Sequence, residues 1–117
     1  MAKKLMKIDL HTHTCYSFDC NTAVDKLVHA AESAGLDAIA ITDHDSISAA
    51  RLAQKLSDKL TIIHGMEITT WKGTHLIGLF LKEKIVSKDI FEAIDEIQKQ
   101  GGLAVLPHPF QIGRAHV

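Results

Sequence analysis

The most constraining feature of the sequence is the run LDAIAIT at residues 36–42, which is almost continuously apolar. A run this short fits a strand rather than a helix. Strands that are apolar on both faces are typical of parallel sheets covered by helices. Segments with a helical pattern lie on both sides of the run, at residues 21–35 and 46–58. The chain is therefore predicted to fold as an α/β protein.

The rest of the chain continues this alternation of strands and helices. Strands are predicted at residues 6–11, 60–68, 74–81 and 103–108, and a third helix at 87–102. Asn21 or Thr22 is expected to cap the first helix and Ser87 the third, and Gly35 to end the first. The order β-α-β-α-β-β-α-β predicts a mainly parallel sheet. A length of 117 residues fits one domain.

Composition excludes some functions. The net charge of -1 provides no overall basic field for holding nucleic acid without sequence preference. No apolar run approaches the roughly 20 residues of a membrane span, so a cytoplasmic location is expected. Cys15 and Cys20 do not have the C-x-x-C spacing of a redox pair or zinc knuckle and are interpreted as free thiols. Histidine is unusually frequent, with eight residues.

Most of the histidines and several acidic residues gather at the predicted strand ends. Two follow the first strand, three the second, and one each marks the end of the third, the start of the fourth and the end of the fifth. In that order they are His11 and His13; Asp43, His44 and Asp45; Glu67; His75; and His108. The carboxyl ends of parallel strands form the ligand-binding rim of α/β folds. A polar site is therefore predicted at this rim.

These residue types suit metal ions. Residues two apart in an extended segment point to the same side, so His11 and His13 can bind one ion together. Imidazole and carboxylate groups suit zinc, iron and manganese. Glu67 has two oxygens and can bridge two ions. Paired ions roughly 3.5–4 Å apart can clamp a phosphoester and generate hydroxide near neutral pH. The pattern therefore favours metal-dependent phosphoester chemistry.

Five segments in order resemble motifs of the PHP family (polymerase and histidinol phosphatase domain): DLHTHTCYSFD, AITDHDSIS, GMEITT, HLIGLF and LPHPF. Within the family the chain looks most like the small phosphoesterases related to nucleoside 3',5'-bisphosphate phosphatases and 5'-3' exoribonucleases. The resemblance implies a distorted (β/α)7 TIM-like barrel with a trinuclear metal centre at its carboxyl rim. It covers only the N-terminal strands and helices of that barrel.

Carried over by position, the resemblance implies three metal sites. His11, His13 and Glu67 would hold the first ion, and Glu67, His75 and His108 the second. Asp19 and His44 would supply part of the third. Asp43 and Asp45 are expected to orient the ligands rather than to bind. Arg114 is a candidate contact for a substrate phosphate.

The sequence departs from the family in two places. The last family motif, a Gly-Ser-Asp-x-His segment that supplies an aspartate and a histidine ligand, is absent. Residues 1–117 are therefore expected to be a single PHP domain truncated before that motif, completed by further chain or by a second copy. The second departure is Phe18-Asp19-Cys20 where the family often has Ser-Asp-Gly, which weakens the assignment of Asp19.

The leading hypothesis is a metal-dependent phosphoesterase with two or three divalent ions of zinc, manganese or iron. A metal-activated hydroxide would attack small phosphate esters, with nucleotides or short oligonucleotides preferred on resemblance alone. One alternative is a catalytically incomplete metal-binding fragment or regulatory module, and another is a histidinol-phosphate phosphatase. Among the residues, Asp19 could be a plain loop acid, His75 a core histidine, and His108 part of a rigid turn.

Overall fold

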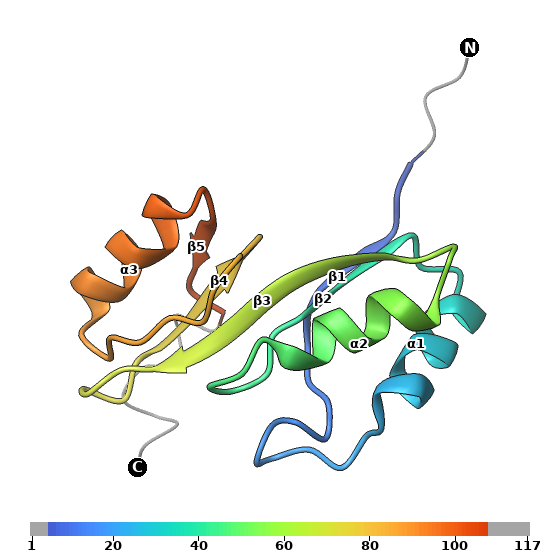
Figure 1. The fold of residues 1–117 in the computed structure, drawn as a ribbon, viewed down its shortest axis with the longest axis horizontal. Helices are drawn as coiled ribbons and strands as arrows, with labels where there is room; N and C mark the ends of the chain where they lie inside the picture. The colour runs from blue at the N-terminus through green and yellow to red at the C-terminus, as the bar shows by residue number, and fades with distance from the viewer. Residues whose placement is uncertain (1–4, 108–117) are drawn as a thin grey trace.

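A computed structural model describes residues 5–107 of the chain (Figure 1). The elements, in order, are β1 (Ile8–Thr12), α1 (Val24–Ser33), β2 (Ala38–Ile41), α2 (Ser48–Leu56), β3 (Thr61–Thr69), β4 (His75–Leu79), α3 (Ile90–Lys99) and β5 (Leu103–Val105). This is the predicted order, and it confirms the α/β class. No helix in the described part of the chain is long and apolar enough to cross a membrane.

The five strands form one curled sheet in the order β1-β2-β3-β4-β5, with β1 and β5 at its edges (Figure 1). β1, β2 and β3 pair in parallel, whereas β4 is antiparallel to both β3 and β5. The prediction of a mainly parallel sheet was thus wrong at β4. Residues 70–74 are too few for the crossover that a parallel strand would need, and a hairpin results. The sheet with its helices is part of a barrel, as predicted.

The helices divide the sheet into two packed regions. α1 and α2 lie beside the β1–β3 part, and α3 lies beside β4 and β5 (Figure 1). Apolar residues of α1 and α2 bury Ile39, Ile41 and Ile62, while α3 packs on the cluster that contains Met66 and Ile68. Alternate strand residues face opposite ways, so Ala38, Ala40 and Ile63 form a separate cluster on the face away from α1 and α2. Glu67 follows Ile63 by four residues and shares that inner face.

Two predicted helix caps were wrong. α1 begins after Ala23, with no side-chain cap from Asn21 or Thr22. Asp89, rather than Ser87, caps α3, because the Asp89 carboxylate accepts a hydrogen bond from the Glu92 backbone N–H at 3.0 Å. Gly35 follows α1 with a φ of 75°, the left-handed conformation in which a glycine carries no Cβ penalty. That part of the prediction is confirmed.

Candidate metal centre

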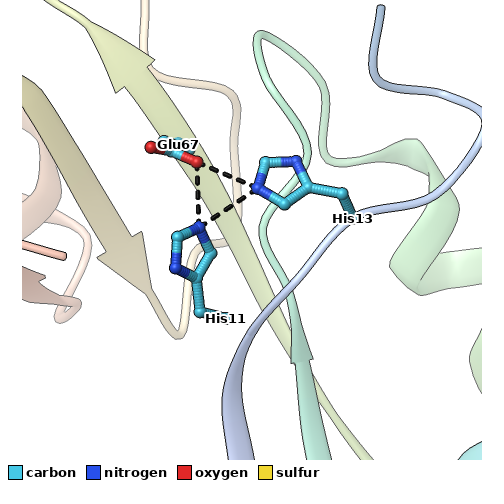
Figure 2. Close-up of side chains that lie close together, drawn as sticks. All are labelled: His11, His13 and Glu67. Carbon is cyan, nitrogen blue, oxygen red and sulfur yellow. Dashed lines mark hydrogen bonds and ion pairs between the residues drawn. The ribbon is translucent and has the colours of Figure 1, made fainter. Parts of the chain in front are cut away.

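The end of β1 delivers two imidazoles to the inner face of the sheet. His11 and His13 are two residues apart, so both rings lie on the same side of the strand (Figure 2). Their Nε2 atoms are 3.1 Å apart. Each also approaches one oxygen of Glu67, with His11 Nε2 3.0 Å and His13 Nε2 2.9 Å from Oε1. Three residues that span 56 positions of the sequence thus meet at a single point.

Glu67 is the centre of the group. It is 2 % exposed, and β3 holds it in place by pairing with β4 on one side and with the segment that follows β2 on the other. Burial by itself would raise the pKa of this carboxyl. Hydrogen bonds from His13 and His11, together with the charge of His44, instead lower the pKa of Glu67 to about 2. The carboxylate is therefore ionised throughout the neutral range, as a metal ligand must be.

The two oxygens of Glu67 face different partners. Oε1 faces His11 and His13, with His44 Nε2 at 3.6 Å, and Oε2 lies 3.0 Å from Nδ1 of His75. His75 opens β4 and pairs with Thr69, the last residue of β3. Because β4 runs backwards, its first residue lies at the edge where β1, β2 and β3 end. The hairpin thus explains how a residue at the start of a strand reaches this site.

The separations between these atoms match those of ligands around one ion. Nitrogen atoms about 2.05 Å from zinc in a tetrahedral site are roughly 3.3 Å apart. Neighbouring ligands about 2.1 Å from an octahedral ion are roughly 3.0 Å apart. The edges of the triangle formed by His11, His13 and Glu67 are 2.9–3.1 Å. The donor atoms therefore have the spacing and chemistry that a divalent ion requires.

Ser17 fixes the orientation of His13, and its side chain is buried. Its hydroxyl donates to Asp19 Oδ1 at 2.8 Å and accepts from the His44 backbone N–H at 3.0 Å. With that hydrogen used, His13 Nδ1, 3.3 Å away, must be the donor to Ser17 Oγ. The lone pair of a neutral His13 is then on Nε2, facing Glu67 and His11. Sequence reasoning missed Ser17, since nothing separates it from any serine in a polar loop.

The electrostatics of His13 follow from this orientation. Its hydrogen bond with Glu67 raises the pKa of His13; burial opposes the shift, and the charges of Glu67, Asp19 and Asp43 add to it. Without a metal, a proton on His13 Nε2 therefore lies between this nitrogen and the Glu67 carboxylate, whose lone pairs would otherwise repel each other. A divalent ion can take the place of that proton. A neutral imidazole offers only one lone pair, so His13 can bind one ion at a time.

Asp19 and His44 form a second group beside the first. His44 Nε2 is 3.2 Å from Asp19 Oδ2, and the ring of exposed Phe18 lies 4.9 Å from that of His44. Burial by itself would raise the pKa of Asp19. The hydrogen bond from the Ser17 hydroxyl and the charges of His44 and His13 outweigh it, so the pKa of Asp19 is lowered. His44 Nδ1 is buried and has no hydrogen-bond partner within the described chain. Together with His13, these residues bring three ligand atoms within 4.8 Å of one another.

The remaining predicted site residues differ in their surroundings. Asp43 is fully buried and accepts hydrogen bonds from the backbone and hydroxyl of Thr14, the latter at 2.7 Å, so it fixes the turn that follows His13. Asp45 is exposed and has a left-handed φ of 58°. His108 and Arg114 lie outside the described residues.

Comparison with known proteins identifies the family. The sequence model of the PHP domain matches residues 9–104 of this chain. The chain belongs to the PHP family. An uncharacterised protein of Methanocaldococcus jannaschii is 37% identical, over 90% of this chain and 68% of its own length. Every described residue of the predicted ligand set lies within the part that matches the PHP domain.

Two further similar proteins have names that state a kind of activity. The 5'-3' exoribonuclease Rnm of Escherichia coli is 38% identical over 61% of this chain and 26% of its own length. A solved structure from Bifidobacterium adolescentis, assigned as a metal-dependent phosphoesterase, is 30% identical with a TM-score of 0.57. That match covers 65% of this chain and 28% of that protein. The chain thus spans about a quarter of these two proteins, and both matches support a metal-dependent phosphoesterase in general.

Proposed function

We propose that the chain is the metal-binding part of a phosphoesterase that hydrolyses small phosphate esters. The observation that carries the proposal is that the two oxygens of Glu67 face different ligands. Oε1 faces His11 and His13, while Oε2 faces His75. A carboxylate in that position can bridge two ions. Bridged ions stabilise the attacking and leaving oxygens of an in-line displacement and lower the pKa of a bound water.

Each residue would have a distinct part in this site. His11 and His13 hold the first ion with Glu67, and His75 holds the second, with His108 proposed as its further ligand from outside the described residues. Asp19 and His44 contribute to a third. Asp43 and Ser17 keep the segment that follows β1 in the conformation that presents these groups. Asp45 is proposed to orient the segment after His44, and Arg114 to contact a substrate phosphate.

Nucleotides or short oligonucleotides are the proposed substrates, with zinc, manganese or iron as the proposed ions. The similarity to an exoribonuclease and the His-carboxylate ligand set support these choices. Residues 1–117 are proposed to be one PHP domain that lacks the last family motif, supported by the partial coverage of the longer relatives. A second copy or further chain is proposed to complete the barrel beside β1 and β5, the sheet edges. A cytoplasmic location stays a prediction.

The test is metal-dependent hydrolysis by the purified chain. Release of phosphate from a panel that includes p-nitrophenyl phosphate, a nucleoside 3',5'-bisphosphate and histidinol phosphate is measured with manganese, zinc or iron, and with chelator. Glu67→Gln keeps the shape of the side chain but removes the charge, and is expected to abolish turnover. Glu83→Gln, on an exposed loop, is the matched control and should match the wild type. Hydrolysis that survives chelation or Glu67→Gln refutes the proposal.

A further inference from the structure

A second candidate binding site lies at the turn between β3 and β4. A cavity of about 240 Å³ opens there between the turn and the start of α3. Its walls include the aromatic rings of Trp71 and Phe91 and the side chains of Lys72 and Lys88. This volume is below the roughly 300–1,000 Å³ of pockets that enclose whole drug-sized ligands, so it suits a single ring system.

Both aromatic walls of the cavity are exposed to solvent. Trp71 and Phe91 are each 79% exposed, and Trp71 is the single tryptophan of the chain. Clustered exposed apolar side chains next to a cavity indicate a binding surface. The Lys88 ammonium lies 5.6 Å from the centre of the Trp71 ring, within the range of a cation–π contact. The cation thus lies over one face of the Trp71 ring.

The cavity is held in shape, and its two lysines outnumber its one acid, Asp89. The Trp71 backbone N–H donates to the Lys88 carbonyl at 2.9 Å, which ties the turn to the start of α3. Asp89 and Ile90 at the start of α3 also line the cavity, and the Asp89 carboxylate caps the helix by accepting from the Glu92 backbone N–H. Thr70, 6% exposed, borders the cavity, and its hydroxyl oxygen has no hydrogen-bond partner in the described part of the chain. The surroundings therefore favour an aromatic ring joined to an anion.

The cavity adjoins the proposed metal centre. Thr74 lines it and directly precedes His75, while Thr70 lies three residues beyond Glu67, about 10 Å along an extended strand. Glu67 faces the inner side of the sheet and Thr70, by alternation, the α3 side. A short single strand held at the metal centre would thus cross the turn to reach the cavity. Base stacking on aromatic side chains beside lysines is how proteins hold single strands.

We propose that this cavity binds one base of a single-stranded oligonucleotide, stacked on Trp71, with an adjoining phosphate held by Lys88. The inference rests on the proposed function, because it names the substrate that the metal centre would act upon. It adds a site for recognising the strand away from the scissile phosphate. Lys72 and Lys88 at the cavity favour a phosphate-bearing strand over an uncharged apolar peptide.

Trp71 fluorescence tests the proposal directly, since no other tryptophan contributes. The full chain, freed of metal with chelator, is titrated with tetra-adenylate and with an abasic ribose-phosphate strand of the same length. Tetra-adenylate is expected to quench the emission, and the abasic strand to leave it nearly unchanged. Lys88→Ala should raise the Kd about fivefold and flatten its salt dependence. Lys84→Ala, an exposed lysine away from Trp71, is the matched control and should stay within about twofold of wild type.

Calorimetry extends the test to variants without tryptophan emission. Trp71→Leu is expected to raise the Kd for tetra-adenylate roughly tenfold, and Trp71→Phe to restore most of the affinity. Equal quenching by the abasic strand, no quenching at all, or an unchanged Kd in Lys88→Ala and Trp71→Leu would overturn the proposal. Because these titrations contain no metal, they measure binding separately from hydrolysis. Intact binding with no hydrolysis under any metal would therefore refute the proposed function alone, and hydrolysis without this binding would refute the base site alone.

Discussion

Ser17→Ala is the variant that most directly tests how this centre is organised. The hydroxyl of Ser17 contacts His13, Asp19 and the backbone of His44, all within 3.3 Å. Removing it frees the His13 ring to adopt the other tautomer or to rotate. The His13 lone pair would then no longer be directed at the point where it meets Glu67 and His11.

The size of the effect follows from what each partner loses. The backbone N–H of buried His44 is left without an acceptor, which costs about 1–3 kcal/mol in the free energy of unfolding. Asp19 is 43% exposed and can bond to water instead, so it adds little. Loss of a residue that orients a metal-binding histidine lowers metal affinity by roughly 10–100-fold. Both changes are expected together in Ser17→Ala.

Two measurements separate these effects. Titration with manganese or zinc, followed by calorimetry, gives the affinity, and denaturant unfolding of the metal-free protein gives the stability. Ser57→Ala is the matched control, because the Ser57 hydroxyl also makes three contacts, with Glu32, Lys59 and Leu60, away from the metal centre. It should lose stability without losing metal affinity. Metal affinity in Ser17→Ala equal to that of the wild type would refute the role assigned to Ser17.

Three further results are expected. Because the pKa of His13 is raised, metal binding near neutral pH should release protons from the protonated fraction of this residue. Calorimetry in buffers of different ionisation enthalpy measures the release, and no release would contradict the ligand role. The lowered pKa of Glu67 stabilises the metal-free protein above pH 4.5, and this contribution is lost as pH falls towards about 2. The raised pKa of His13 stabilises the metal-free protein below pH 6.5, and this contribution is lost as pH rises through the raised pKa. Denaturant unfolding of the wild type across pH should show both trends, whereas Glu67→Gln should lose the first and weaken the second. Gly65→Ala should lower the free energy of unfolding by about 1–3 kcal/mol, because the new Cβ would lie 2.8 Å from the Gly78 carbonyl oxygen. Gly78→Ala should lower it less, because its new Cβ would meet the flexible Ile97 side chain. Equal unfolding midpoints for the two variants would contradict this.

The sequence allowed much of the fold to be predicted, because its apolar pattern is locally clear. The nearly continuous run at residues 36–42 contains the buried strand β2, and the helical stripes are helices. The cap of α3 was misplaced, since Ser87 and Asp89 are both good caps and the apolar stripe cannot choose between them. The direction of β4 follows from a short turn rather than from the strand itself. Local patterns thus predict elements better than they predict strand direction.

The candidate site was predictable where its residues are chemically unusual. His11 and His13 stand out by type and spacing, and Glu67 stands out as an acid in an apolar strand. Ser17 and Trp71 do not stand out, because their roles depend on neighbours that only the folded chain supplies. The exposure of Asp45 was equally hidden, since its sequence position beside His44 says nothing about where its side chain lies.

The most direct test of this account is the metal content of the chain. Elemental analysis of protein purified without a metal-affinity step is compared with that of His11→Ala and Glu67→Ala. The account predicts two or three ions per chain in the wild type, fewer in His11→Ala, and the greatest loss in Glu67→Ala, because Glu67 faces both halves of the site. No bound metal in the wild type, or unchanged content in both variants, would contradict the assignment of this centre.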